Sequence, residues 1–192
     1  MTDNAFLNAR RRWLESGAPA EHGIFIRERM RAGELSLEKV RLAAYLGIRG
    51  ASLALASQCP PSPPPVEEVE WIGVLHDQWG TEALVRAAVA IAGCGGRDYS
   101  QHQGLQEAFS RASRWVAGER PVEKPPDYKE GHPREPRLAR ALSYQLDRIL
   151  FHDFPERYSW TASYLFWGRM LHFLPSARSS VEESLGSWAL GE

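Results

Sequence analysis

The sequence predicts an all-α protein of about ten helices, built as an irregular bundle or a HEAT-like stack of helical hairpins. Two stretches predict this most clearly, because their apolar residues recur every three or four positions, as in a helix packed on other helices. The first stretch places on one face Leu105, Ala108, Phe109, Ala112, Trp115 and Val116. The second places on one face Leu138, Ala141, Leu142, Gln145, Leu146 and Ile149. A third observation is that glycine follows several of the expected helices, where it serves as a helix stop.

The first four expected helices form an N-terminal layer over residues 1–58. Ser36 is a good N-cap for the third helix, since its hydroxyl can accept a bond from a free backbone N–H. Small apolar residues in 51–56 suit close approach between helices. The expected helices cover 4–15, 21–32, 37–46 and 49–57, and the stops are Gly17, Gly33 and Gly47.

A proline-rich run, 59–65, follows this layer and reads Cys-Pro-Pro-Ser-Pro-Pro-Pro. Proline has a fixed φ and no N–H, so the run is expected to be neither helix nor sheet but an extended polyproline segment. We interpret it as a stiff connector to a C-terminal layer, 66–192, within one helical domain that covers 1–192. A ligand for a proline-recognising groove is the alternative.

Six further helices are expected in the C-terminal layer. Glu67 and Glu68 lie in the first turn of the fifth helix, where negative charge complements the helix dipole. Gly93, Gly95 and Gly96 are expected to end the sixth helix and Gly118 the seventh, and the ninth is expected to end before Pro175. The expected ranges are 66–79, 81–92, 101–117, 136–151, 156–174 and 180–190.

Charge is balanced over the whole chain, at −1, but it is unevenly placed. A near-zero net charge gives no global attraction to nucleic acid or anionic lipid. Residues 1–58 are basic overall, whereas residues 66–93 carry only Arg86 against Glu67, Glu68, Glu70, Asp77 and Glu82. This indicates complementary neighbouring helices or a polar binding face. We therefore take Glu67, Glu68 and Glu70 as candidate partner-binding residues.

The expected compartment is the cytoplasm. Only two cysteines occur, Cys59 and Cys94, so we expect free thiols in a reducing environment. The N-terminal residues show no secretory signal. The longest apolar-rich stretch, 160–174, is too short and too often interrupted by polar residues to span a bilayer.

No catalytic, cofactor or metal motif stands out, so none of these sites is expected. The chain lacks a nucleophile elbow, a phosphate-binding loop and the usual zinc spacings. An enzyme with a dispersed site is the first alternative, and its candidate residues are His76, Asp77, His152 and Asp153.

An Arg-mediated nucleic-acid binder is the second alternative. Its candidates are the clusters Arg10–Arg12 and Arg27–Arg31. Glutamates are interleaved with these arginines, however, whereas a nucleic-acid footprint shows a clear excess of one sign. Solvated faces with ion pairs along the helices are therefore the expected arrangement.

The aromatic-rich helix expected over 156–174 is the candidate partner surface. One apolar stripe includes Trp160, Tyr164 and Trp167, and a second comprises Leu165, Phe166, Met170 and Phe173. A helix that is apolar on two faces is either central in a bundle or half of an interface. Tryptophan and tyrosine are favoured interface anchors, so Trp160, Tyr164 and Trp167 are the partner-binding candidates on this helix.

Two stretches carry a resemblance to known proteins. Residues 102–118, with the following Glu119, resemble a helix of the all-helical immunity proteins in bacterial polymorphic-toxin systems. Residues 27–55 resemble helical-repeat proteins of high-GC bacteria, and only three of the chain's basic residues are lysine. The resemblance implies a non-enzymatic protein-binding module, either an immunity or an adaptor protein in bacterial competition or defence. Its partner would be another protein, such as a toxin or a defence effector.

Overall fold

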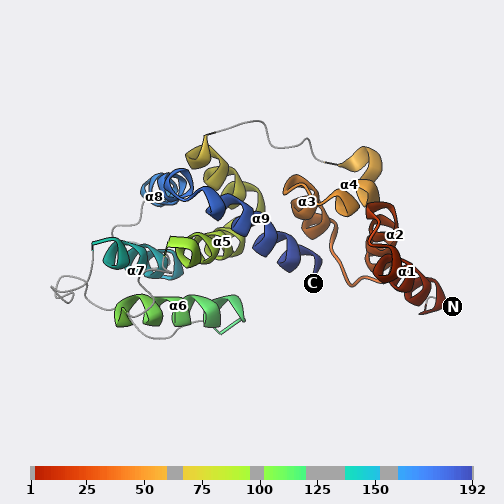
Figure 1. Cartoon of the computed structure of the whole chain (residues 1–192), viewed down its shortest axis with the longest axis horizontal. Coiled ribbons are helices and arrows are strands. Elements are labelled where there is room, and N and C mark those ends of the chain that lie inside the picture. Colours follow the sequence, from red (N-terminus) through yellow and green to blue (C-terminus); the bar gives the residue numbers. More distant parts are fainter. Residues whose placement is uncertain (1–2, 60–66, 96–101, 120–136, 152–159, 192) are drawn as a thin grey trace. The chain divides into compact units, whose positions relative to one another are not determined.

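The computed structural model describes residues 3–59, 67–95, 102–119, 137–151 and 160–191, and all the regular structure within them is helical (Figure 1). The all-α prediction is thus confirmed. The elements run in chain order as α1 (Asp3–Ser16), α2 (Pro19–Arg31), α3 (Leu37–Tyr45), α4 (Arg49–Leu55), η1 (Ala56–Gln58), α5 (Glu68–Gly95), α6 (Gln103–Val116), α7 (Arg137–Leu150), α8 (Trp160–Phe173) and α9 (Pro175–Leu190).

Several helix ends follow the sequence signals. Gly17, Gly33, Gly47 and Gly118 all have positive φ at the ends of helices, a conformation that glycine adopts without steric cost. The Ser36 hydroxyl caps α3 by accepting a bond from the backbone N–H of Lys39 at 3.3 Å. The expected break after residue 79 is also present, because Gly80 has φ 79° and ψ −177° and interrupts the helical geometry of α5.

Some boundaries follow the sequence prediction and others differ. α5 reaches Gly95, one of the three glycines expected to end this helix. Pro175 begins α9, whereas the sequence predicts a start at 180. Proline is tolerated at the first helical position because an N–H there has no partner within the helix. The helix expected over 49–57 ends at Leu55 and gives way to the 3₁₀ turn η1.

The chain forms two compact units. Unit 1 comprises Met1–Pro65 with Glu182–Glu192, and unit 2 comprises Val66–Val181. Residues 182–192, expected from the sequence to belong to the C-terminal layer, group with the N-terminal residues. The single domain and the polyproline connector stay predictions, as residues 60–66 lie outside the described part of the chain.

Unit 1 is packed around α2, which contacts α1 and α4. The ring of Trp13 stacks on His22, with centroids 4.4 Å apart, and on Phe25, at 5.2 Å. Gly23 lets α2 approach α4 closely, because a Cβ there would lie 3.0 Å from the carbonyl oxygen of Gly50. Aromatic stacking and small residues therefore hold these helices together.

Unit 2 is built from two helix pairs, α5 with α8 and α6 with α7. In Figure 1, α6 and α7 lie alongside each other next to the later part of α5. The apolar faces of α6 and α7 are directed inward as their spacing predicts, with six fully buried members: Leu105, Ala108, Ala112, Leu142, Leu146 and Ile149. Burial of these faces is what stabilises the pair.

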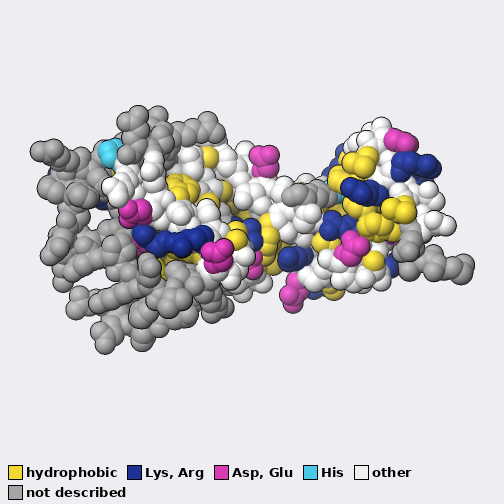
Figure 2. Space-filling model, turned by 90° about the horizontal axis from the view of Figure 1, so that it is seen from below, with side chains coloured by type: hydrophobic (Ala, Val, Ile, Leu, Met, Phe, Trp, Pro, Cys, Tyr) yellow, Lys and Arg dark blue, Asp and Glu magenta, His cyan; other side chains and the backbone are white. Residues whose placement is uncertain are grey.

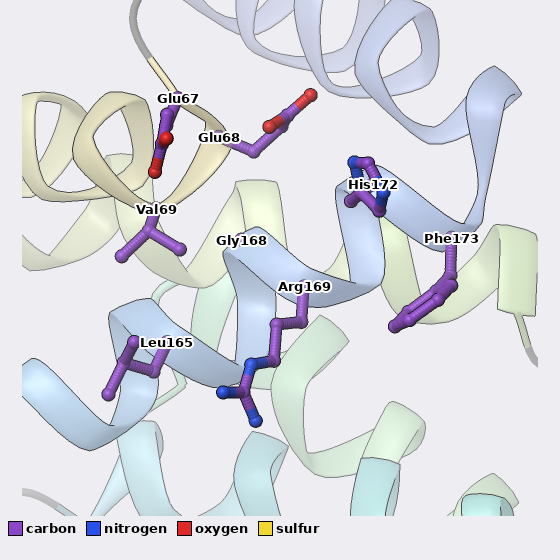
Figure 3. Close-up of a pocket in the computed structure, with 8 residues that line it drawn as sticks. All are labelled: Glu67, Glu68, Val69, Leu165, Gly168, Arg169, His172 and Phe173. Carbon is purple, nitrogen blue, oxygen red and sulfur yellow. The ribbon is translucent and has the colours of Figure 1, made fainter.

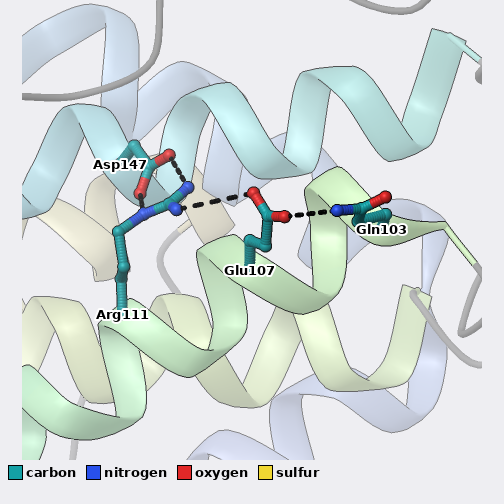
Figure 4. Close-up of polar contacts among 4 residues, drawn as sticks. All are labelled: Gln103, Glu107, Arg111 and Asp147. Atoms are coloured by element: carbon teal, nitrogen blue, oxygen red, sulfur yellow. Dashed lines mark hydrogen bonds and ion pairs between the residues drawn. The ribbon is translucent and has the colours of Figure 1, made fainter.

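A buried ion pair joins α6 to α7 (Figure 4). The Arg111 guanidinium donates two hydrogen bonds to the carboxylate of Asp147, at 2.8 and 2.5 Å, and Asp147 is only 1% exposed. Glu107 lies 3.9 Å from Arg111 at the surface and accepts a bond from Gln103 at 2.8 Å. The parallel two-bond geometry fixes the register of the two helices.

Candidate functional site

The candidate site lies along α8, which runs antiparallel to the first part of α5. Three residue pairs set the register: Val69 with Gly168, Gly73 with Tyr164, and His76 with Trp160. Gly168 permits the tightest of these contacts, since a Cβ there would lie 2.5 Å from Cα of Val69. The small residue thus sets how closely α8 approaches the start of α5.

A groove of about 600 Å³ lies between the beginning of α5 and the second half of α8 (Figure 3). Its two most exposed apolar side chains come from α8: Leu165 is 43% exposed and Phe173 is 72% exposed. The full lining is Glu67, Glu68, Val69, Leu165, Gly168, Arg169, His172 and Phe173. Exposed apolar residues with a polar rim are typical of a surface that binds a protein segment.

The groove carries charges of both signs. Figure 3 shows Glu67 and Glu68 on the α5 side and Arg169 on α8, between Leu165 and Phe173. Glu68 lies in the first turn of α5, where the helix dipole favours a carboxylate. A bound segment would therefore meet acidic side chains from α5 and, on α8, an apolar pair with a basic residue between its members.

The structure separates the predicted partner-binding residues into four groups. Glu67 and Glu68 line the groove, and Glu70 is exposed but outside it. Trp160 and Tyr164 are half-buried against His76. Trp167 has no exposed area, so it belongs to the core between helices and not to the surface of the folded chain.

The residues missed as candidates are Arg169 and His172, together with the apolar pair Leu165 and Phe173. Leu165 and Phe173 belong to the second apolar stripe that the sequence predicts for this helix. Periodicity alone does not show which stripe faces the core, because both stripes on this helix are equally apolar. Because interfaces are rich in aromatic residues, the stripe with Trp160, Tyr164 and Trp167 was preferred as the partner surface. In the structure this stripe is partly buried, and Trp167 is completely buried.

A second cluster surrounds His76 at the other end of the α5–α8 pair. The Nδ1 atom of His76 lies 2.6 Å from the Tyr164 hydroxyl, Nε2 lies 3.4 Å from the Thr81 hydroxyl, and the ring stacks on Trp160 at 4.0 Å. The Tyr164 hydroxyl also donates to Asp77 at 3.5 Å, and Asp77 is 73% exposed. The structure thus brings His76 and Asp77 together with Trp160 and Tyr164.

The pKa of Tyr164 is raised to about 12, first by burial and then by the charge of Asp77 and the hydrogen bond to it. Its phenol therefore stays protonated and acts as a donor, which suits a structural link between α5 and α8 better than a catalytic base. The other two residues of the dispersed-enzyme alternative, His152 and Asp153, lie outside the described residues.

The arginine clusters of unit 1 are interleaved with acidic partners. Arg12 pairs with Glu21 at 3.3 Å, and Arg31 with Glu28 at 2.6 Å. In Figure 2, blue and magenta side chains both occur over the described surface, among apolar ones. In the described ranges, no helix is both long and apolar enough to cross a bilayer, and no three potential metal-binding side chains converge.

Comparison with protein-family models, with curated proteins and with solved structures gives no match to this chain.

Proposed function

We propose that this chain is a non-enzymatic protein-binding module that holds a segment of another protein in the α5–α8 groove. The observation that carries the proposal is the exposed apolar pair on α8, Leu165 and Phe173, at a groove whose edges are charged. Their spacing of eight residues corresponds to about 12 Å along the helix. Two anchors at that distance suit a partner helix with apolar residues two turns apart.

The biological role that we propose is that of an immunity or adaptor protein in bacterial competition or defence, acting in the cytoplasm. The resemblance of residues 102–119 to the helical immunity proteins supports this role. A toxin or defence effector is the expected class of partner. Four arginines in the described part of unit 1 pair with glutamates. This supports protein binding over the nucleic-acid alternative, because a nucleic-acid footprint shows a clear excess of one sign.

Photo-cross-linking in cells of the native host tests the proposal. A benzoyl-phenylalanine placed at position 165 reports on the groove, and the same probe at Leu14, which is 65% exposed on α1, is the matched control. We expect a discrete cross-linked product containing this chain from position 165 and not from position 14. The same products, or none, at both positions would contradict the proposal.

A further inference from the structure

The exposed stripe of α8 has a positive charge at its centre. Arg169 lies between Leu165 and Phe173 (Figure 3), four residues from each, so the three side chains follow one another along one face at intervals of about 6 Å. All three are exposed. In the described part of the chain, no carboxylate forms an ion pair with Arg169. Its guanidinium can therefore pair with a group that approaches from outside.

The acidic side chains of the groove come from a different helix. Glu67 and Glu68 lie at the beginning of α5, beside the second half of α8, because Val69 packs against Gly168. Neither carboxylate forms an ion pair with another of the described residues. An approaching segment therefore meets positive charge within the apolar stripe and negative charge beside it (Figure 3).

We infer that the segment held in the groove is an amphipathic helix with an Asp or Glu at the centre of its apolar stripe and with Lys or Arg on the flank that lies over α5. This inference names the chemistry of the partner and so rests on the function proposed above. The carboxylate pairs with Arg169, and the apolar residues one turn before and after it pack on Leu165 and Phe173. The basic flank faces Glu67 and Glu68.

Loss of water from Arg169 is the reason that the partner carries a carboxylate. A helix that covers both Leu165 and Phe173 also covers the residue between them, so the guanidinium is withdrawn from water. A buried charge without a partner strongly disfavours binding, whereas a carboxylate that accepts two of its N–H bonds offsets the loss of water. A helix with Lys or Leu at this position is rejected, so Arg169 selects among helices of similar hydrophobicity.

The peptides cross-linked to the groove reveal the chemistry of the partner directly. Benzoyl-phenylalanine is placed at position 165 in one full-length variant and at position 173 in another, and tandem mass spectrometry identifies the attached residues after irradiation of the native host. We expect attachment points about eight residues apart in one partner segment, with an Asp or Glu between them. A segment without a carboxylate in that interval would overturn the inference and leave the binding function supported. No product at either position would contradict both.

Substitution of Arg169 tests the ion pair. Arg169→Met keeps most of the apolar stem and removes the charge, whereas Arg169→Glu reverses the charge. Both should lower the yield of the product from position 165, by about tenfold or more for Arg169→Glu, because the partner carboxylate is left unpaired or is opposed. Arg114→Glu, at an exposed arginine of α6, is the matched control and should leave the yield unchanged. An undiminished product from Arg169→Met would show that the guanidinium turns to solvent in the complex, and would overturn the inference.

Reversal of the acidic pair tests the basic flank. Glu67→Lys combined with Glu68→Lys places positive charge beside the Lys or Arg of the partner and should lower the yield of the same product through repulsion. Glu119→Lys, at an exposed glutamate that follows α6, is the control and should have no effect. An unchanged yield from the double variant, folded by circular dichroism, would overturn the basic flank.

Discussion

At the scale of single residues, the environment of Tyr164 shows how α5 and α8 are joined by polar contacts. Its hydroxyl lies 2.6 Å from Nδ1 of His76 and 3.5 Å from a carboxylate oxygen of Asp77. Burial, followed by the charge of Asp77, disfavours the phenolate. The folded state therefore holds this proton more tightly than the unfolded chain does.

The raised pKa of Tyr164 makes the stability of the chain depend on pH in an alkaline window. Between pH 10.0 and about 12 the unfolded chain loses the Tyr164 proton while the folded chain retains it, so the free energy of unfolding falls as the pH rises through this range. Urea denaturation below pH 10 and at about pH 11 measures this fall. Tyr164→Phe should reduce it, and an equal fall in both proteins would contradict the assignment.

The ion pair between Arg111 and Asp147 leads to a second prediction at this scale. Asp147→Ala leaves a largely buried guanidinium without its carboxylate and should lower the free energy of unfolding by about 3 kcal/mol or more. Glu107→Ala is the control, since Glu107 lies 3.9 Å from the same guanidinium and its side chain is 51% exposed. It should cost less than about 1 kcal/mol. Equal costs in urea denaturation would show that the buried pair has no special role.

At the scale of helices, two glycines are expected to respond in opposite directions to the same substitution. Gly168→Ala should destabilise the protein by about 1–3 kcal/mol, because its Cβ would meet the backbone of Val69 and push α8 away from α5. Gly93→Ala should stabilise it by up to about 1 kcal/mol, since among the described residues the new Cβ would have no neighbour within 4 Å beyond the adjoining backbone, and alanine favours the helix. Thermal unfolding of the two variants distinguishes them, and the same sign for both would refute this account of the α5–α8 contact.

Helices with a single apolar face could be predicted from the sequence. The inward faces of α6 and α7 followed from apolar spacing alone, because their polar residues leave one arrangement that buries the apolar ones. The break at Gly80 could also be predicted, because glycine tolerates the positive φ that a break requires.

The groove on α8 could not be assigned from the sequence. Trp167 and Phe173 belong to two stripes of similar hydrophobicity. Only the packing of α5 on α8 shows that the Trp167 side chain is buried and the Phe173 side chain is exposed. Glu67 and Glu68 were identified from their charge, but their position beside α8 depends on a contact between segments about a hundred residues apart.

At the scale of the whole chain, unit 2 places a stabilising core and the proposed binding surface on opposite sides of one helix. The buried side of α8, with Trp167 and Met170, packs in the core, while the exposed side, with Leu165 and Phe173, borders the groove. Losing a core aromatic typically costs about 3–5 kcal/mol of stability. Replacing an exposed residue usually changes stability by less than about 0.5 kcal/mol.

The most direct test of the binding groove is the yield of the product cross-linked from position 165 when Phe173 is replaced by aspartate. We expect Phe173→Asp to abolish that product while the melting temperature stays close to that of the parent chain, because Phe173 contributes to the surface and not to the core. Trp167→Ala, measured alongside, should instead lower the melting temperature strongly. An undiminished cross-linked product from a folded Phe173→Asp variant would contradict the claim that this groove binds a protein.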